Sequence, residues 1–67
     1  MGAAGARQLL ARRRAEQRLA ELGFDNASAG GLAEDYASNP SSSDGRLVAR
    51  VLAGSRAAIA QLKRTNP

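Results

Sequence analysis

Arginine is the residue type through which this sequence can do the most chemistry. Its 67 residues include ten basic and six acidic side chains, which gives a net charge of +4, and Lys63 is the only basic residue that is not arginine. A guanidinium group forms paired hydrogen bonds with phosphate or carboxylate oxygens. A basic chain of this kind favours nucleic acid or an acidic protein surface as its partner.

Five arginines are the candidate phosphate ligands. At 100° per residue, Arg7, Arg14 and Arg18 share one side of a helix. We expect phosphates to contact Arg7, Arg14, Arg18, Arg50 and Arg56. The alternative is a solvated helix face with intrahelical ion pairs, for which Arg12 with Glu16 and Arg18 with Glu21 have suitable spacings. Aromatic side chains do not alternate with the arginines, so single-stranded nucleic acid is the less favoured ligand.

Catalytic groups are poorly represented. The sequence has no His and no Cys, so it lacks the commonest general base and the thiolate ligands of metal sites. Glu34 and Asp35 are adjacent, and on a helix they point about 100° apart, which keeps them from sharing one acid–base site. The serines have no partner base in motif spacing, and the glycines match no phosphate-binding or dinucleotide-binding pattern. We therefore expect no enzymatic activity, no cofactor and no metal site.

The elements that position these side chains are predicted to be helices. Ala and Leu supply most of the apolar character, and they favour helices over strands. The pattern predicts an all-α fold with three helices, over residues 4–22, 27–38 and 45–64. The first and third are expected to be long and roughly antiparallel, with the short second helix packed across them. Residues 1–67 are expected to form one small domain with frayed ends at 1–3 and 65–67.

Gly and Asx residues predict the boundaries of the first two helices. Gly23 is suited to a C-terminal cap that lets Phe24 fold back onto the last turn. The second helix has three candidate N-caps, which are Asp25, Asn26 and Ser28. Asn39-Pro40 is expected to end it, since a residue before proline disfavours helix.

The third predicted helix has the widest apolar face, formed by Leu47, Val48, Val51, Leu52, Ala58, Ile59 and Leu62. Ser43 or Asp44 is expected to cap its start, while Gly54 and Ser55 would permit a close crossing of a neighbouring helix. A chain of this size without disulfides is marginal alone and gains stability by association. The face therefore predicts the alternative function, a non-catalytic structural or assembly subunit that docks through its C-terminal helix, with a homo-oligomer as one form.

One stretch resembles a known family. From Gln17 to Ala29 the sequence predicts a helix, a Gly turn and a capped second helix, as in a helix–turn–helix motif. Gly23-Phe24, Ser28-Ala29, Ala33, Tyr36-Ala37 and Asn39-Pro40 resemble the N-terminal DNA-binding part of phage terminase small subunits. The resemblance covers about 26 residues and implies that the second helix faces DNA.

The sequence departs from that family on the second helix itself. This helix carries Glu34 and Asp35 and no basic residue, and acidic side chains repel phosphate. The corner Leu22-Gly23-Phe24 also resembles the Met-Gly-Phe turn of ubiquitin-associated three-helix domains, although the link from Tyr36 to Leu47 is long for such a domain. An ordinary helix–Gly–helix corner is the third interpretation.

No apolar run approaches the roughly 20 residues of a membrane span, so we expect no membrane partner. The cytoplasm or the interior of a virion is the expected location. Residues 1–15 are rich in Ala and Arg and contain no acidic residue, which leaves organellar import open.

Overall fold

The computed structural model describes residues 2–66, and this part of the chain is built from four helices. They are α1 (Gly2–Glu21), α2 (Asn26–Ser38), α3 (Ser43–Leu52) and α4 (Arg56–Thr65), with no strand among the described residues. The prediction of an all-α fold is confirmed. The prediction of three helices is wrong, because the segment 45–64 forms two helices instead of one.

Helices reach close to both ends of the described chain. Gly2 is the first residue of α1 and Thr65 is the last residue of α4. The prediction of frayed ends at 1–3 and 65–67 falls partly on residues 1 and 67, which lie outside the described residues.

A glycine turn joins α1 to α2. Gly23 has a φ of +99°, in the left-handed region that glycine adopts without steric cost. The Phe24 amide donates to the Leu19 carbonyl and the Gly23 amide to the Ala20 carbonyl, both at 3.1 Å. This is a Schellman cap, which satisfies the last carbonyls of α1. Phe24 folds back into the core and is 4% exposed, so the predicted cap is confirmed.

The start of α2 is fixed by a side-chain cap. Of the three candidates, Asp25 is the N-cap, and its Oδ1 accepts a hydrogen bond from the Ser28 amide at 2.8 Å. α2 ends at Ser38, directly before Asn39-Pro40, as predicted. The first two predicted helices therefore have nearly the correct bounds.

The start of α3 depends on a close approach to the preceding loop. Ser42 is the N-cap, not Ser43 or Asp44, and its Oγ accepts from the Gly45 amide at 3.0 Å. Gly45 is buried, and a Cβ at this position would lie 2.6 Å from the Asn39 carbonyl oxygen. The first turn of α3 can therefore pack against the loop only because residue 45 has no side chain.

A second glycine turn separates α3 from α4 and explains the incorrect helix count. Gly54 has a φ of +97°, and the Ser55 amide donates to the Arg50 carbonyl at 2.9 Å. The left-handed residue cannot continue a right-handed helix, so α3 ends here. Ser55 then begins α4 as its N-cap, because its Oγ accepts from the Ala58 amide at 3.2 Å. Gly54 and Ser55 thus break the predicted helix, whereas the sequence predicted that they would permit a close crossing of a neighbouring helix.

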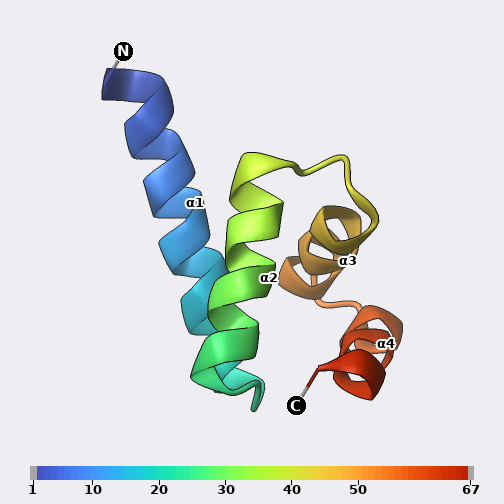
Figure 1. Ribbon diagram of the computed structural model, residues 1–67. Helices are drawn as coiled ribbons and strands as arrows, with labels where there is room; N and C mark the ends of the chain where they lie inside the picture. Colours follow the sequence, from blue (N-terminus) through green and yellow to red (C-terminus); the bar gives the residue numbers. More distant parts are fainter. Residues whose placement is uncertain (1, 67) are drawn as a thin grey trace.

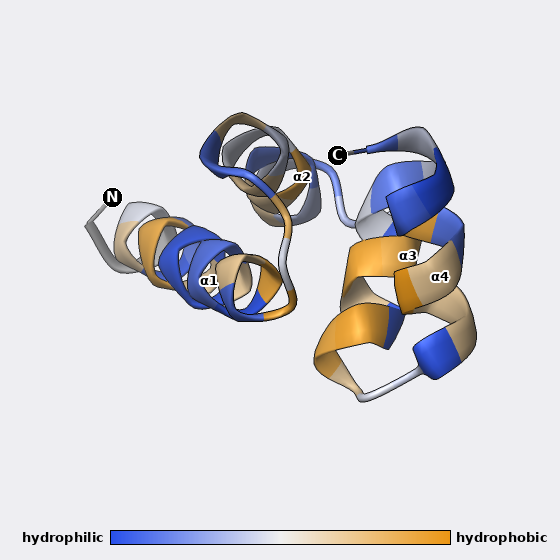
Figure 2. Cartoon of the chain, turned by 90° about the horizontal axis from the view of Figure 1, so that it is seen from below, coloured by the Kyte–Doolittle hydropathy of each residue, from blue (hydrophilic) through white to orange (hydrophobic). Residues whose placement is uncertain are grey.

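The helices form two neighbouring pairs. α1 and α2 run antiparallel, and α2 also packs against α3, which makes few contacts with α1 (Figure 1). Viewed from below, α3 and α4 lie together on the opposite side of α2 from most of α1 (Figure 2). The predicted pair of long antiparallel helices is therefore wrong. The antiparallel neighbour of the 20-residue α1 is the 13-residue α2.

All four helices contribute to one hydrophobic core. Its buried members are Ala15, Leu19, Phe24, Ala29, Leu32, Ala33, Val48, Val51, Ala58 and Leu62. Four of these ten residues are alanines, and each alanine buries little apolar area. The core is thin, so individual large side chains such as Leu19 and Leu62 carry much of its stabilisation.

Candidate nucleic-acid interface

Every basic residue of the chain is exposed. The ten are Arg7, Arg12, Arg13, Arg14, Arg18, Arg46, Arg50, Arg56, Lys63 and Arg64. Within the described residues only Arg18 forms an ion pair, with Glu21 at 3.3 Å, and both side chains are about half exposed (49% and 54%). The other predicted pair, Arg12 with Glu16, does not form. The chain therefore presents many cations that its own acidic residues do not neutralise.

The predicted arginine side of α1 lies on one uninterrupted helix. Arg7, Arg14 and Arg18 are all exposed on α1. At 1.5 Å per residue, Arg14 lies about 10 Å from Arg7 and about 6 Å from Arg18 along the axis. These spacings suit successive contacts along a phosphate backbone.

Arg50 and Arg56 lie on either side of the α3–α4 turn. Arg50 is in the last turn of α3 and Arg56 is the first residue of α4, so the two flank the residues 53–55. The five predicted phosphate ligands therefore form two groups, one on α1 and one at the α3–α4 corner.

α4 carries a basic surface that the sequence interpretation only partly identified. Its sequence contains Arg56, Lys63 and Arg64 and no acidic residue. Arg56 and Arg64 are eight residues apart and therefore share a side of the helix, together with Ala60 between them. Arg64 was not among the predicted phosphate ligands, because residues 45–64 were treated as one continuous helix with one apolar face. The four-residue spacing of Arg56, Ala60 and Arg64 was the signal that could have identified it.

Lys63 is arranged differently from the other α4 cations. Its Nζ lies 5.6 Å from the centroid of the Phe24 ring. This cation–π contact ties α4 to the α1–α2 corner. Lys63 thus has a structural partner, whereas Arg56 and Arg64 have no ion pair within the described residues.

The apolar face predicted as a protein interface lies mostly inside the chain. Val48, Val51, Ala58 and Leu62 are buried in the chain's own core, and Leu47, Leu52 and Ile59 pack against it partly buried. The large apolar side chains that remain exposed are Leu9 (44%) and Leu10 (50%) on α1. Apolar surface for a partner is therefore located on the N-terminal part of α1.

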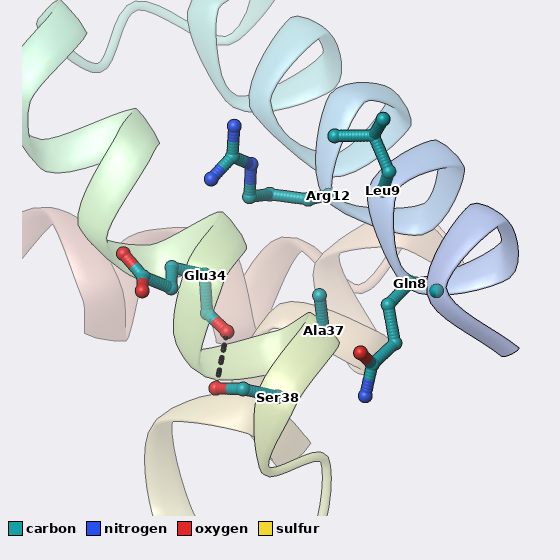
Figure 3. Close-up of a pocket in the computed structure, with 7 residues that line it drawn as sticks. Gln8, Leu9, Arg12, Glu34, Ala37 and Ser38 are labelled. Carbon is teal, nitrogen blue, oxygen red and sulfur yellow. Dashed lines mark hydrogen bonds between the residues drawn. The ribbon is translucent and has the colours of Figure 1, made fainter. Parts of the chain in front are cut away.

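A shallow groove of about 240 Å³ lies beside Leu9, between α1 and α2. Gln8 and Arg12 extend into it from α1, and Glu34 and Ser38 line it from α2 (Figure 3). The Ser38 hydroxyl donates to the Glu34 carbonyl at 2.7 Å, so it is occupied within its own helix. Glu34 is exposed. The groove thus combines one cation and one carboxylate on opposite walls.

Three other acidic residues have structural or solvated positions. Asp25 caps α2, while Asp35 and Asp44 are exposed. Among residues 2–66, no three His, Cys, Asp or Glu side chains gather as metal ligands would. In the same residues, no helix has the length and apolar character needed to cross a membrane.

Comparison with protein-family models, with curated proteins and with solved structures gives no match to this chain.

Proposed function

We propose that this chain is a nucleic-acid-associated protein that binds phosphates through its exposed arginines. The observation that carries the proposal is that all ten basic side chains are exposed and one of them is ion-paired within the described residues. Exposed and unneutralised guanidinium groups on rigid helices are the groups that bind a phosphate backbone and release its counterions. The location proposed together with this function is the cytoplasm or the interior of a virion, with an organelle as the alternative.

The position of α2 affects which helix faces the nucleic acid. The resemblance to phage terminase small subunits assigns this role to α2. In this chain α2 packs against both α1 and α3, and its exposed side chains include Glu34 and Asp35. Phosphate would be repelled from this surface, so we assign the contacts to α1 and to the α3–α4 corner instead.

Two neighbouring arginines on α1 provide a matched test of the proposal. Arg14 lies on the side shared with Arg7 and Arg18, and Arg13 is turned about 100° away from it. Arg14→Gln and Arg13→Gln remove the same charge from the same exposed stretch of helix. Binding of each variant to a fluorescent duplex, measured by anisotropy over a series of salt concentrations, separates a positioned contact from net charge.

Arg14→Gln should weaken binding and reduce the slope of log affinity against log salt by about 1, since one phosphate contact is lost. Arg13→Gln should change the slope much less. Equal effects of the two substitutions would contradict a positioned α1 contact. Affinity that does not depend on salt would contradict the proposed function as a whole.

A second candidate function is that of an assembly subunit formed by copies of this chain. The exposed Leu9 and Leu10 favour it, because they give α1 an apolar surface beside the α1–α2 groove. The adjacent groove carries Arg12 on one wall and Glu34 on the other, so a second copy could offer each a partner of opposite charge.

The self-association candidate makes its own prediction about molecular mass. Mass measured by light scattering should rise with protein concentration, and Leu9→Gln combined with Leu10→Gln should keep the chain monomeric. Ala20→Gln, a substitution of another exposed α1 residue, is the control and should leave association unchanged. A monomeric mass over the whole accessible concentration range would eliminate this candidate.

A further inference from the structure

We propose that α3 and α4 form a helix–turn–helix unit whose second helix, α4, enters the major groove of duplex DNA. The inference rests on the proposed function, because it names the form of nucleic acid and the reading element. It also relocates the helix–turn–helix from the α1–α2 corner, where the sequence predicted it, to the next pair of helices.

The connection between α3 and α4 has the properties that this unit needs. Three residues, 53–55, separate the helices, and Gly54 makes the reversal at a φ of +97°. The Ser55 amide donates a hydrogen bond to the last turn of α3, and the Ser55 hydroxyl caps the start of α4, so one residue stabilises the ends of both helices. A turn of three to four residues that contains Gly is typical of helix–turn–helix units. Ala58 and Leu62 hold α4 in the core and fix its rotation.

The opposite side of α4 is shaped for close approach. Ala60 lies two residues from both Ala58 and Leu62, and therefore about 160° around the helix from each. Ala57 and Ala60 are exposed and small, so they leave the backbone of α4 accessible. Arg56 and Arg64 lie one turn before and one turn after Ala60. They are about 12 Å apart along the axis, with Ala60 between them.

α3 supplies the contacts that the first helix of such a unit makes with the DNA backbone. Arg46 and Arg50 are exposed, four residues apart, and each is two residues from the buried Val48. They therefore share the solvent side of α3. In helix–turn–helix proteins the first helix crosses the backbone while N-terminal residues of the second contact base edges. This assigns phosphate contacts to Arg46 and Arg50 and base contacts to Arg56.

The experiment is a selection of preferred duplexes from a randomised DNA library by the full chain, followed by affinity measurements. The readout is the ratio of affinities for the selected duplex and for a scrambled duplex of equal length. Arg56→Ala should reduce this ratio roughly five- to a hundredfold, because a bidentate arginine–guanine contact discriminates by that amount. Arg14→Ala is the matched control and should weaken both duplexes equally, since a phosphate contact carries no sequence information.

A second pair of variants tests the approach of α4 without removing an arginine. Ala60→Glu places a carboxylate at the centre of the proposed contact surface and should weaken duplex binding by more than tenfold. Ala27→Glu adds the same charge at an exposed position on α2 and should have a much smaller effect. Both positions are helical and Glu is a good helix former, so circular dichroism should show that both variants fold.

The outcomes separate this inference from the proposed function. A preferred duplex that loses its advantage in Arg56→Ala, together with the loss of binding in Ala60→Glu, supports the inference. Salt-dependent binding without any preferred duplex, or equal effects of Ala60→Glu and Ala27→Glu, would overturn the inference and leave the proposed function standing. The absence of duplex binding at any salt concentration would overturn both.

Discussion

The Nζ atom of Lys63, in the last turns of α4, lies 5.6 Å from the centroid of the Phe24 ring, in the turn between α1 and α2. Phe24 is itself buried by the fold-back of the Schellman cap. α4 follows the Gly54 turn, and Phe24 belongs to the Gly23 turn. The contact between Lys63 and Phe24 therefore connects the two glycine turns indirectly. It is the interaction in the described residues that ties α4 to the first helix pair through a charged group.

Removal of this contact should have a small but measurable effect. Lys63→Met keeps an unbranched side chain over the ring and removes the charge, so the free energy of unfolding should fall by about 0.5–1 kcal/mol. A double-mutant cycle with Phe24→Leu, followed by urea denaturation, measures the coupling between the two residues. Additive effects of the two substitutions would show that the ammonium group and the ring do not interact.

The turn between α3 and α4 should be sensitive to the loss of glycine. Gly54→Ala puts a Cβ into open space, but it forces a left-handed backbone on alanine, so stability should fall by about 1–2 kcal/mol. Gly54→Asn should cost less, because asparagine adopts that region more readily. Thermal unfolding followed by circular dichroism ranks the three proteins. An alanine variant as stable as the wild type would contradict the break between the helices.

A different mechanism operates at Gly45. The helix there has ordinary backbone angles, but a Cβ would meet the Asn39 carbonyl oxygen at 2.6 Å and the Pro40 Cα at 2.9 Å. Gly45→Ala should therefore destabilise the protein by about 1–3 kcal/mol through steric overlap. Gly31→Ala is the matched control, because position 31 is helical with no atom within 4 Å of its Cβ, and it should raise stability by up to about 1 kcal/mol. Urea denaturation of both variants should show effects of opposite sign.

Two leucines distinguish the core from the surface. Leu62 is 1% exposed, and Leu62→Ala should cost about 2–5 kcal/mol, which is enough to unfold a small domain. Leu10 is 50% exposed, and Leu10→Ala should change stability by about 0.5 kcal/mol or less. The loss of helical circular dichroism at room temperature in the Leu62 variant alone is the expected result. Similar stabilities of the two variants would contradict the assignment of the core.

The sequence was sufficient to predict the first half of the fold. Gly23 and Phe24 identify a helix end by local chemistry, and the three candidate N-caps Asp25, Asn26 and Ser28 limit the next start to a few residues, so α1 and α2 could be placed with small errors. These capping signals can be identified without knowledge of contacts between residues distant in the sequence. The helical character of the chain followed from its Ala- and Leu-rich composition in the same way.

The spacing of the apolar residues gives no indication of the break between α3 and α4 at Gly54. Val51 and Ala58 are seven residues apart, which is close to two helical turns, so the pattern continues in phase through a turn that is not helical. Both residues are buried because α3 and α4 each face the same core. Gly54 followed by Ser55 is the local pattern of a helix break, because glycine is suited to a left-handed C-terminal cap and serine to an N-cap. This pattern should have outweighed the continuous spacing of the apolar residues.

The candidate site was predicted in its residue types more than in its arrangement. The arginines are exposed as expected, since a charged side chain stays in water unless it is paired. The common side of Arg7, Arg14 and Arg18 on α1 followed from their spacing. The grouping of arginines at the α3–α4 corner depends on the break, and the outward position of Arg64 depends on the burial of Leu62. The predicted interface failed as a free surface for the same reason, because four of its seven residues form the chain's own core.

The salt dependence of duplex DNA binding by the wild-type chain tests the central claim most directly. If Arg7, Arg14, Arg18, Arg46 and Arg50 each neutralise one phosphate while Arg56 contacts a base, log affinity should fall with log salt concentration with a slope of about −4 to −5. Arg7→Gln, Arg14→Gln and Arg18→Gln in one chain should reduce the slope to about −2. A wild-type slope near zero, or a slope unchanged in the triple variant, would contradict phosphate binding through these arginines.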